Sequence, residues 1–321
     1  MTTRPPVDAL VIGAGVIGLA TAITFAEAGH RVLVRTAEPL EQTTSAVAGA
    51  LWGPWMAEPA DRAMTWAAHT LTFLTDLAGR PGTGVRVATG TDVSNVEHEP
   101  PEWFSLLRGL RPCHGDELPP GYAHGNRYTA PLVDMPVHLR YLANRLHAAG
   151  GEIAVESVDT IEDAADLALL IINCAGLGAR NLASDTQLYP VRGQHVVVTN
   201  PGITDFLEVD TADSPDLVAI YPHGDHVVLG GTAEPHRWDR TPDPVTAAAI
   251  LKRCTALDPR LRDAEIIEHR VGLRPTRPQV RLELGQGPSG SIVVHNYGHG
   301  GAGVSLSWGC AAKAFTLVSQ L

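Results

Sequence analysis

The feature that most constrains the fold of this chain is a glycine pattern near the amino terminus. A G-x-G-x-x-G hexapeptide follows an apolar run of strand length at 9–12, opens a helical pattern at 16–28, and is followed by a second apolar run at 31–34. The hexapeptide consists of Gly13, Ala14, Gly15, Val16, Ile17 and Gly18. In a β-α-β unit these glycines permit a tight turn, the approach of a pyrophosphate and close helix packing. The pattern predicts a dinucleotide site and leaves NAD and FAD open, with a ligand-free glycine turn as the alternative.

The carboxylate that would hold the ribose is displaced from its usual place. An acidic residue is expected about 20 positions after the glycine pattern, at the end of the second strand. Arg35 follows that strand here, and the nearest carboxylate is Glu38. Glu38 is therefore either a ribose contact or a solvated loop residue.

Composition narrows the class of partner. The 321 residues include 24 Lys+Arg and 35 Asp+Glu, so the net charge of −11 repels nucleic acid and anionic membrane surfaces. The chain is 44% hydrophobic and 18% charged, which predicts a large buried core. Without a long apolar run or CxxC spacing among its 4 cysteines, neither a membrane span, a zinc site nor a disulfide framework is expected. We expect a cytoplasmic protein, since the final Ser-Gln-Leu only loosely matches a peroxisomal ending.

Two kinds of pattern alternate along the chain. Helices are predicted at 60–77 and 136–149, and the continuously apolar run at 167–172 is typical of a central strand in a parallel sheet. Residues 192–231 form short β-rich runs separated by turns, which predicts an antiparallel sheet. The fold class predicted is α/β, with a Rossmann-like nucleotide-binding domain interleaved with a β-rich domain.

The carboxy-terminal region contains a dense glycine cluster. A predicted strand at 291–295 leads into the sequence HNYGHGGAG at 295–303. Such a backbone can pass close to a flat ligand, and the helix predicted at 303–319 can stabilise negative charge at its amino terminus. A tight turn is the alternative interpretation. His295 and His299 lie in this turn without a third ligand, so no metal is expected.

At this point the sequence resembles the D-amino-acid oxidase family. The stretch 295–303, followed after five residues by Gly-Cys-Ala at 309–311, is similar to the family signature. Residues 43–52 (TTSAVAGALW) resemble its second flavin-contacting segment, and residues 271–278 (VGLRPTRP) resemble its substrate-carboxylate segment. With the amino-terminal glycines, the motifs occur in family order along the whole chain, and that order is more specific than any single motif.

The resemblance implies an FAD-dependent protein of two intertwined domains. We expect an FAD-binding domain at 1–52, 136–185 and 280–321, and a substrate-binding domain at 53–135 and 186–279. Within the hexapeptide, the residues from Ala14 to Ile17 would contact the pyrophosphate. The other implied FAD contacts are Thr43, Thr44, Ser45, Gly49, Ala50 and Leu51 along the ribityl and flavin, Val158 near the adenine, and Gly300, Gly301, Gly303, Val304 and Ser305 at the pyrimidine edge.

The resemblance also implies a reaction. A hydride passes from the α-carbon of a D-amino acid to flavin N5, the imino acid hydrolyses to a 2-oxo acid and ammonia, and oxygen reoxidises the flavin with formation of hydrogen peroxide. Arg274 matches the residue that binds the α-carboxylate through two charged hydrogen bonds, and the Gly301 carbonyl matches the acceptor of the amino group. No acid or base residue is required. Arg277 and Arg281 are expected to be structural or surface residues.

The substrate side of the match is less regular. Family members commonly place a tyrosine three residues before a proline, where this chain has Ala219, and Tyr221 is a candidate replacement on the same strand face. Ala233 stands where aspartate-selective relatives carry an arginine, so a neutral or apolar D-amino acid is the expected substrate. Oxygen is the second expected partner, and a homodimer is left open.

Other classes of protein stay open from the sequence alone. A glycine- or sarcosine-type amine oxidase is a sister interpretation. A nicotinamide-dependent dehydrogenase would share the β-α-β unit, but the purified protein would be colourless. A non-catalytic regulator would bind FAD and leave it oxidised when D-amino acids are added.

Overall fold

The computed structural model describes residues 7–97, 99–209 and 216–321, so the first six residues of the expected FAD-binding domain lie outside the described part. The strands are β1 Ala9–Ile12, β2 Val32–Thr36, β3 Val85–Ser94, β4 Arg108–Pro112, β5 His124–Val133, β6 Glu152–Val155, β7 Leu170–Asn173, β8 Tyr189–Thr199, β9 Phe206–Val209, β10 Asp216–His223, β11 His226–Thr232, β12 Glu234–Pro235, β13 Ile266–Gln286 and β14 Ile292–His299. The α-helices of the described residues are α1 Val16–Glu27, α2 Ala60–Ala78, α3 Met135–Ala148, α4 Ile161–Ala165, α5 Ala179–Leu182, α6 Pro244–Leu257 and α7 Gly303–Ser319.

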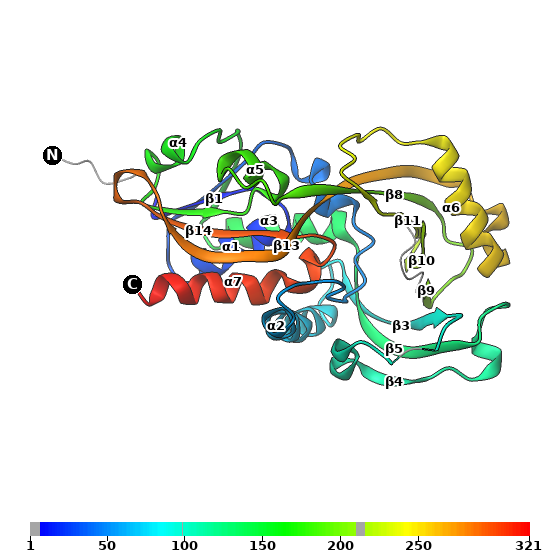
Figure 1. Ribbon diagram of the computed structural model, residues 1–321. Coiled ribbons are helices and arrows are strands. Elements are labelled where there is room, and N and C mark those ends of the chain that lie inside the picture. Colours follow the sequence, from blue (N-terminus) through cyan, green and yellow to red (C-terminus); the bar gives the residue numbers. More distant parts are fainter. Residues whose placement is uncertain (1–6, 98, 210–215) are drawn as a thin grey trace.

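One sheet runs through the whole molecule (Figure 1). Its strand order is β4-β5-β3-β9-β10-β11-β8-β13-β14-β7-β1-β2-β6, with β12 paired to β8. The end that contains β1 is parallel, and the strands from β9 to β8 are antiparallel. The predicted α/β fold with two interleaved strand patterns is therefore confirmed.

The predicted β-α-β unit forms the centre of the parallel part. β1 pairs in parallel with β2 and with β7, and β14 adds in parallel to β7. Ala9 and Val11 pack in the hydrophobic cluster that contains α1, whereas Leu10 and Ile12 pack in the cluster that contains α4. A strand that is buried on both faces requires the continuous apolar run that this sequence has.

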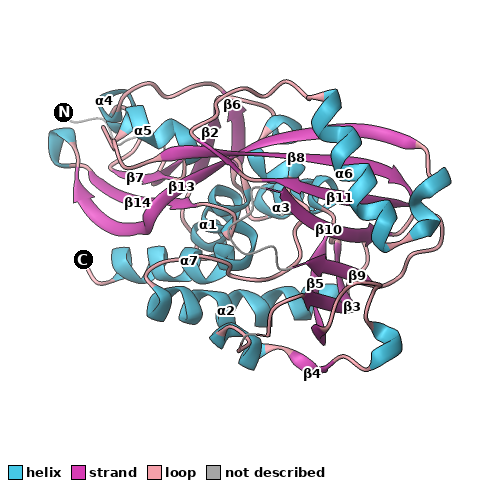
Figure 2. Cartoon of the chain, turned by 45° about the vertical axis from the view of Figure 1, so that its right-hand side comes forward, coloured by secondary structure: helices cyan, strands magenta, loops and turns pink. Residues whose placement is uncertain are grey.

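The antiparallel part is covered on one face by α6 (Figure 2). Val196, Ile220 and Leu229 pack against Ile250 of this helix in a separate hydrophobic cluster. Helix α6 was not predicted from the sequence. Its start signal is nevertheless a common one, because Asp243 caps the first turn and Pro244 follows it. The opposite face of these strands is turned toward the candidate site.

β13 joins the two parts of the sheet, and Figure 1 shows this orange strand passing from one into the other. It pairs with β8 as far as Thr276, which also pairs with His299 of β14, and the pairing with β14 continues from Arg281 after a register shift. Pro278 lies in this register shift, where a missing backbone N–H is tolerated. Residues near the middle of β13 therefore lie where the parallel and antiparallel parts meet.

The carboxy-terminal helix α7 packs against α1 and α2, and Figure 2 shows α7 and α2 side by side. A Cβ on Gly309 would lie 2.2 Å from the Trp66 carbonyl oxygen, so glycine permits this close approach. Trp308 stacks on Phe73 with ring centroids 3.7 Å apart. The helices predicted at 60–77, 136–149 and 303–319 are confirmed to within one residue at each end.

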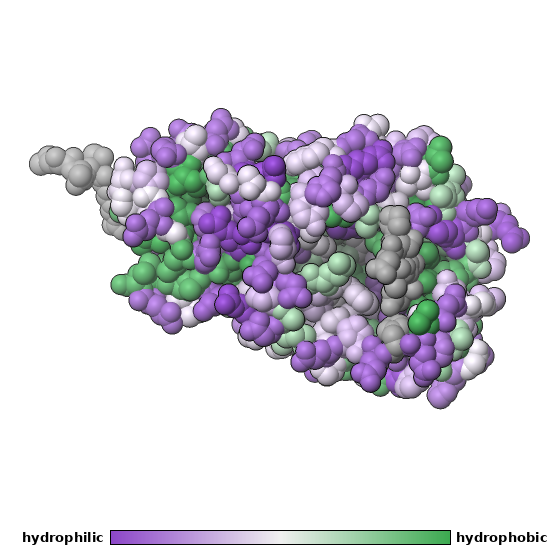
Figure 3. Space-filling view, viewed as in Figure 1, coloured by the Kyte–Doolittle hydropathy of each residue, from purple (hydrophilic) through white to green (hydrophobic). Residues whose placement is uncertain are grey.

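Polar side chains cover most of the face seen in Figure 3. Within the described ranges, no helix combines the length and the apolar character needed to cross a membrane. The strand predicted at 167–172 begins three residues later, and the strand predicted at 291–295 continues into the glycine cluster as far as His299.

His138 of α3 couples the stability of the fold to pH. Its side chain is fully buried, and Nδ1–H donates to the Thr83 carbonyl at 2.8 Å. Burial lowers its pKa from 6.5 to about 4, so the neutral ring stabilises the fold above pH 6.5 and loses that contribution as the pH falls toward 4. In urea titrations, His138→Asn should lose less unfolding free energy than wild type between these two pH values. The exposed His69→Asn is the control, and equal pH slopes for His138→Asn and wild type would contradict the prediction.

Candidate active site

The amino-terminal glycines have two different surroundings. A Cβ on Gly13 would lie 2.4 Å from the Cys174 carbonyl oxygen, and one on Gly18 would lie 1.9 Å from the Gly13 carbonyl oxygen. These two glycines are therefore required by the packing of the chain itself. Among the described residues, a Cβ on Gly15 would meet the Ser45 side chain, the nearest atom at 3.0 Å. Gly15 is partly exposed at the start of α1, so a phosphate can approach its backbone.

The segment 43–51 links α1 to β13. The Ser45 hydroxyl oxygen accepts the Val16 backbone N–H at 3.0 Å, and the Thr44 hydroxyl donates to the Leu273 carbonyl at 3.1 Å. Further along, a Cβ on Gly49 would lie 2.6 Å from a ring carbon of Tyr221. The structure thereby brings the first two sequence motifs next to the predicted substrate strand.

The rest of this segment is fixed by backbone contacts. The Thr43 hydroxyl donates to the Leu40 carbonyl at 2.7 Å. The Ala50 carbonyl, at a residue with φ of 59°, accepts the Val133 N–H at 3.1 Å, and Leu51 forms a bridge with Leu132.

The carboxy-terminal glycine cluster lies directly beside Arg274. The Gly300 N–H donates to the Pro275 carbonyl at 2.8 Å, and a Cβ on Gly301 would lie 3.6 Å from Arg274 Cδ. Gly300 has a φ of 54°, which favours glycine. At Gly303, where α7 begins, a Cβ would come no closer than 3.9 Å to its nearest neighbour, so the backbone there is open.

The first turn of α7 is hydrogen-bonded to the loop that follows Leu51. The Ser305 hydroxyl donates to the Gly53 carbonyl at 3.0 Å and accepts the Gly53 N–H at 2.9 Å. Val304 and Ser305 are both buried. Ser305 of the predicted flavin segment 300–305 is therefore hydrogen-bonded to Gly53, two residues after the end of the predicted segment 43–51.

Arg274 is the one arginine of the predicted substrate segment that lacks an acidic partner among the described residues. Its side chain is half-buried, and Nη1 donates to the Thr232 carbonyl at 3.0 Å. Burial lowers the pKa of its guanidinium below the ordinary range of arginine. By contrast, Arg277 pairs with Asp185 at 2.9 Å and Arg281 with Glu283 at 2.8 Å, in agreement with their expected structural role.

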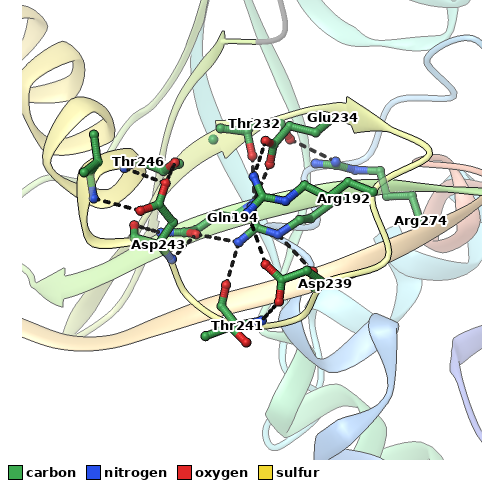
Figure 4. A network of polar contacts seen from close by, with 12 residues as sticks. Arg192, Gln194, Thr232, Glu234, Asp239, Thr241, Asp243, Thr246 and Arg274 are labelled. Carbon is green, nitrogen blue, oxygen red and sulfur yellow. Dashed lines mark hydrogen bonds and ion pairs between the residues drawn. The ribbon is translucent and has the colours of Figure 1, made fainter.

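A fully buried arginine anchors the backbone beside this site (Figure 4). Arg192 of β8 donates to the Glu234 carboxylate at 2.6 Å and to the Gln194 side-chain oxygen at 2.9 Å. It also donates to the carbonyls of Asp239 and Thr241 at 3.0 and 2.8 Å. These bonds hold the segment after β12 against β8.

This network reaches Arg274 through Thr232. The Gln194 backbone N–H donates to the Thr232 hydroxyl oxygen at 3.1 Å, and the Thr232 carbonyl accepts from Arg274. This network was not predicted from the sequence. The one signal for it was the charged residue Arg192 in a strand that is otherwise mostly apolar.

Tyr221 lies on the face turned toward Gly49, and its hydroxyl donates to the carboxylate of Glu208 in β9. His195 of β8 lies beside them, and its Nδ1–H donates to the Val47 carbonyl at 3.1 Å. Burial, reinforced by the charge of Arg274, lowers the pKa of His195 to about 4, so its ring is neutral at physiological pH. Neither Glu208 nor His195 was predicted from the sequence.

Two predicted FAD contacts lie away from this junction. Glu38 follows β2 and forms an exposed ion pair with Arg240 at 2.6 Å. Val158 follows β6 and packs against the hydrophobic cluster that contains Leu10 and Ile12 of β1. The ribose and adenine roles of these two residues stay predictions.

The β-α-β unit has a partly exposed glycine, Gly15, at the start of its helix, and β13, which joins the two parts of the sheet, carries the half-buried Arg274. Fold and site together therefore define a nucleotide-dependent enzyme. The family model described as FAD dependent oxidoreductase matches residues 8–316. The chain belongs to this family of FAD-dependent oxidoreductases.

Curated relatives and solved structures agree with this assignment. D-amino-acid oxidase of Rubrobacter xylanophilus is 47% identical over 318 residues, which cover 99% of this chain and 97% of the relative. D-amino-acid oxidase of Streptomyces coelicolor is 46% identical over 315 residues, which cover 97% of each chain. The structure of glycine oxidase from Geobacillus kaustophilus has a TM-score of 0.80 at 21% identity, over 98% of this chain and 95% of that one. The last likeness concerns the fold, and the two relatives confirm the resemblance seen in the sequence.

The residues present fit FAD. A dinucleotide needs backbone that a side chain would otherwise obstruct, and the structure provides it at Gly15 and at Gly303. Each of these glycines lies at the amino-terminal end of a helix, α1 or α7, where anionic groups are stabilised.

Proposed function

We propose that this enzyme oxidises D-amino acids to 2-oxo acids and ammonia. The observation that carries the proposal is the place of Arg274, half-buried beside Gly301 and, among the described residues, without a carboxylate partner. A ligand carboxylate would complete the hydrogen bonds of this guanidinium. The names of the relatives that are 47% and 46% identical over nearly the full chain support the proposal.

When bound, FAD supplies the acceptor for two electrons and a proton. The proposed contacts are those implied by the resemblance: the hexapeptide 13–18 at the pyrophosphate, residues 43–51 along the ribityl and flavin, and residues 300–305 at the pyrimidine edge. The hydrogen bond between Val16 and Ser45, and the one between Ser305 and Gly53 just after the second segment, support the proposal. Glu38 and Val158 complete the proposed set.

The substrate would be held between Arg274 and the glycine cluster. Arg274 would bind the α-carboxylate with the N–H groups that Thr232 leaves free, and the Gly301 carbonyl would accept from the amino group. The amino terminus of α7 would stabilise negative charge that develops nearby. The chemistry therefore needs positioning by these groups more than a general acid or base.

The alternatives are less well supported. The family is FAD dependent, so a nicotinamide-dependent dehydrogenase is not retained. The glycine oxidase structure is only 21% identical to this chain, whereas the relatives that are 47% and 46% identical are named D-amino-acid oxidase. An acidic substrate is disfavoured because Ala233 offers no cation, and neutral or apolar side chains remain the expected class.

Anaerobic flavin bleaching tests the proposal. We expect the purified yellow protein to lose its visible flavin absorbance with D-amino acids, and to keep it with their L-enantiomers. Glycine and sarcosine should bleach it more slowly, because their α-carbon has no side chain to be oriented in the site. Bleaching by L-amino acids, or by glycine and sarcosine alone, would overturn the assignment.

Four further statements are predictions that accompany this function. Oxygen is proposed as the final electron acceptor, which a peroxide assay would check. A homodimer is proposed as a candidate assembly, to be tested by sedimentation. A cytoplasmic location, with the peroxisome as the weaker alternative, and the division into the two interleaved domains given above also stay predictions.

A further inference from the structure

A half-buried carboxylate, that of Glu208, is hydrogen-bonded to the hydroxyl of Tyr221. Glu208 accepts the Tyr221 hydroxyl with one carboxylate oxygen and the Tyr128 hydroxyl, at 3.1 Å, with the other. Tyr128 is fully buried and Glu208 is half-buried. In the part of the chain that the structure describes, Glu208 forms no ion pair with a lysine or arginine.

Among the described residues, the groups that hydrogen-bond to the carboxylate of Glu208 are the two neutral tyrosine hydroxyls. Burial raises its pKa above the ordinary range, while the two tyrosine hydrogen bonds lower it. Burial and the nearby carboxylate raise the pKa of both tyrosines well above 10, so they remain neutral donors. Asp92, the in-register neighbour of Glu208 on β3, is also buried, and its charge contributes to the raised pKa of both tyrosines. A cation placed beside Glu208 would therefore be strongly stabilised.

Tyr221 connects this carboxylate to the proposed substrate site. Glu208 pairs directly with Ala219 across β9 and β10, so Glu208, Ala219 and Tyr221 lie on one face of the sheet. The ring of Tyr221 faces Gly49, and the charge of Arg274 acts on its hydroxyl. Tyr221 thus has the cation of Arg274 near one side and the anion of Glu208 at its hydroxyl.

We infer that Glu208 is a specificity-determining residue that admits D-amino acids with a cationic side chain, such as D-lysine. The inference rests on the proposed function. With its α-carboxylate on Arg274, such a substrate would direct its terminal ammonium toward Glu208 and form a charge-assisted hydrogen bond there. An acidic side chain would meet like charge at the same place. The substrate range would therefore extend from neutral to cationic side chains.

The test compares D-lysine with D-norleucine, which has the same carbon chain and lacks the ammonium. In Glu208→Gln we expect kcat/KM for D-lysine to fall about 10- to 100-fold, mainly through KM, because one charged hydrogen bond is lost. For D-norleucine it should change by no more than about 3-fold, within the effect of a neutral substitution. Tyr128→Phe is the matched control, since it removes one hydrogen bond to the same carboxylate and keeps the charge. It should retain the wild-type ratio of the two substrates.

An equal loss for both substrates in Glu208→Gln, or no loss for D-lysine, would overturn the inference. If that variant does not fold, the wild type decides: a kcat/KM for D-lysine below that for D-norleucine rejects recognition of the cation. Failure of the proposed function is distinguishable, because the wild type would then oxidise neither substrate.

Discussion

Arg274→Ala is expected to keep its FAD and to lose most of its turnover. Truncating one partner of a desolvated charge pair costs about 2–5 kcal/mol. That cost corresponds to a fall in kcat/KM of about 30- to 4,000-fold. The side chain lies between Thr232 and Gly301, so its loss removes the proposed substrate clamp, while the hydrogen bonds that fix residues 16, 45 and 305 do not involve Arg274. Visible absorbance measures the flavin, and steady-state kinetics with a neutral D-amino acid measure turnover.

Two companion variants separate charge from geometry. Arg274→Lys keeps the cation and loses the planar fork, so it should recover only part of the activity. Arg281→Ala removes a nearby arginine that pairs with Glu283, and should alter thermal stability with little change in kcat/KM. Near-normal kcat/KM in Arg274→Ala would reject its assignment as the substrate clamp.

Glu234→Met is expected to destabilise the fold by about 3–5 kcal/mol, because it leaves the fully buried Arg192 without its carboxylate. Urea denaturation of the holoenzyme should show the loss as a lower midpoint with an unchanged slope. Turnover should also fall in this variant, since the network fixes Thr232 and through it Arg274.

The double variant Arg192→Met/Glu234→Met is the control. It removes the buried charge together with its partner, so it should be more stable than Glu234→Met alone. If the unfolding free energy of Glu234→Met were within about 1 kcal/mol of the wild-type value, the pair of Arg192 and Glu234 would contribute no more than an ordinary surface ion pair.

Local patterns were enough to predict the elements that surround the proposed cofactor site. The hexapeptide 13–18 and the glycine cluster at 298–303 carry their signal within a few residues, and α1 and α7 begin at the residues predicted. The β-rich part was predicted from alternating apolar runs between 192 and 231. These features depend on spacing along the chain, which a single sequence displays directly.

The missed features depend on pairing between distant strands. Glu208 meets Tyr128 only because β9 lies between β3 and β10, and nothing near position 208 reveals that order. Arg192 of β8 forms its ion pair with Glu234, which lies opposite it on the paired strand β12. Likewise, β13 contains two prolines in its sequence, so its 21-residue length could not be predicted from strand propensity. Sequence predicted that Tyr221 shares a face with Ala219, but not that its hydroxyl is bound to a carboxylate.

The continuous strand β13 has a consequence for how such an enzyme can diversify. The Pro275 carbonyl accepts the Gly300 N–H, so the strand that carries Arg274, the proposed substrate clamp, is hydrogen-bonded to the glycine cluster. A one-residue insertion there would turn every following side chain to the opposite face and separate the two. Substitutions on β9 and β10 have no such effect on the clamp. New side-chain preferences can therefore arise at positions such as Glu208 while the reacting end of the substrate keeps its place.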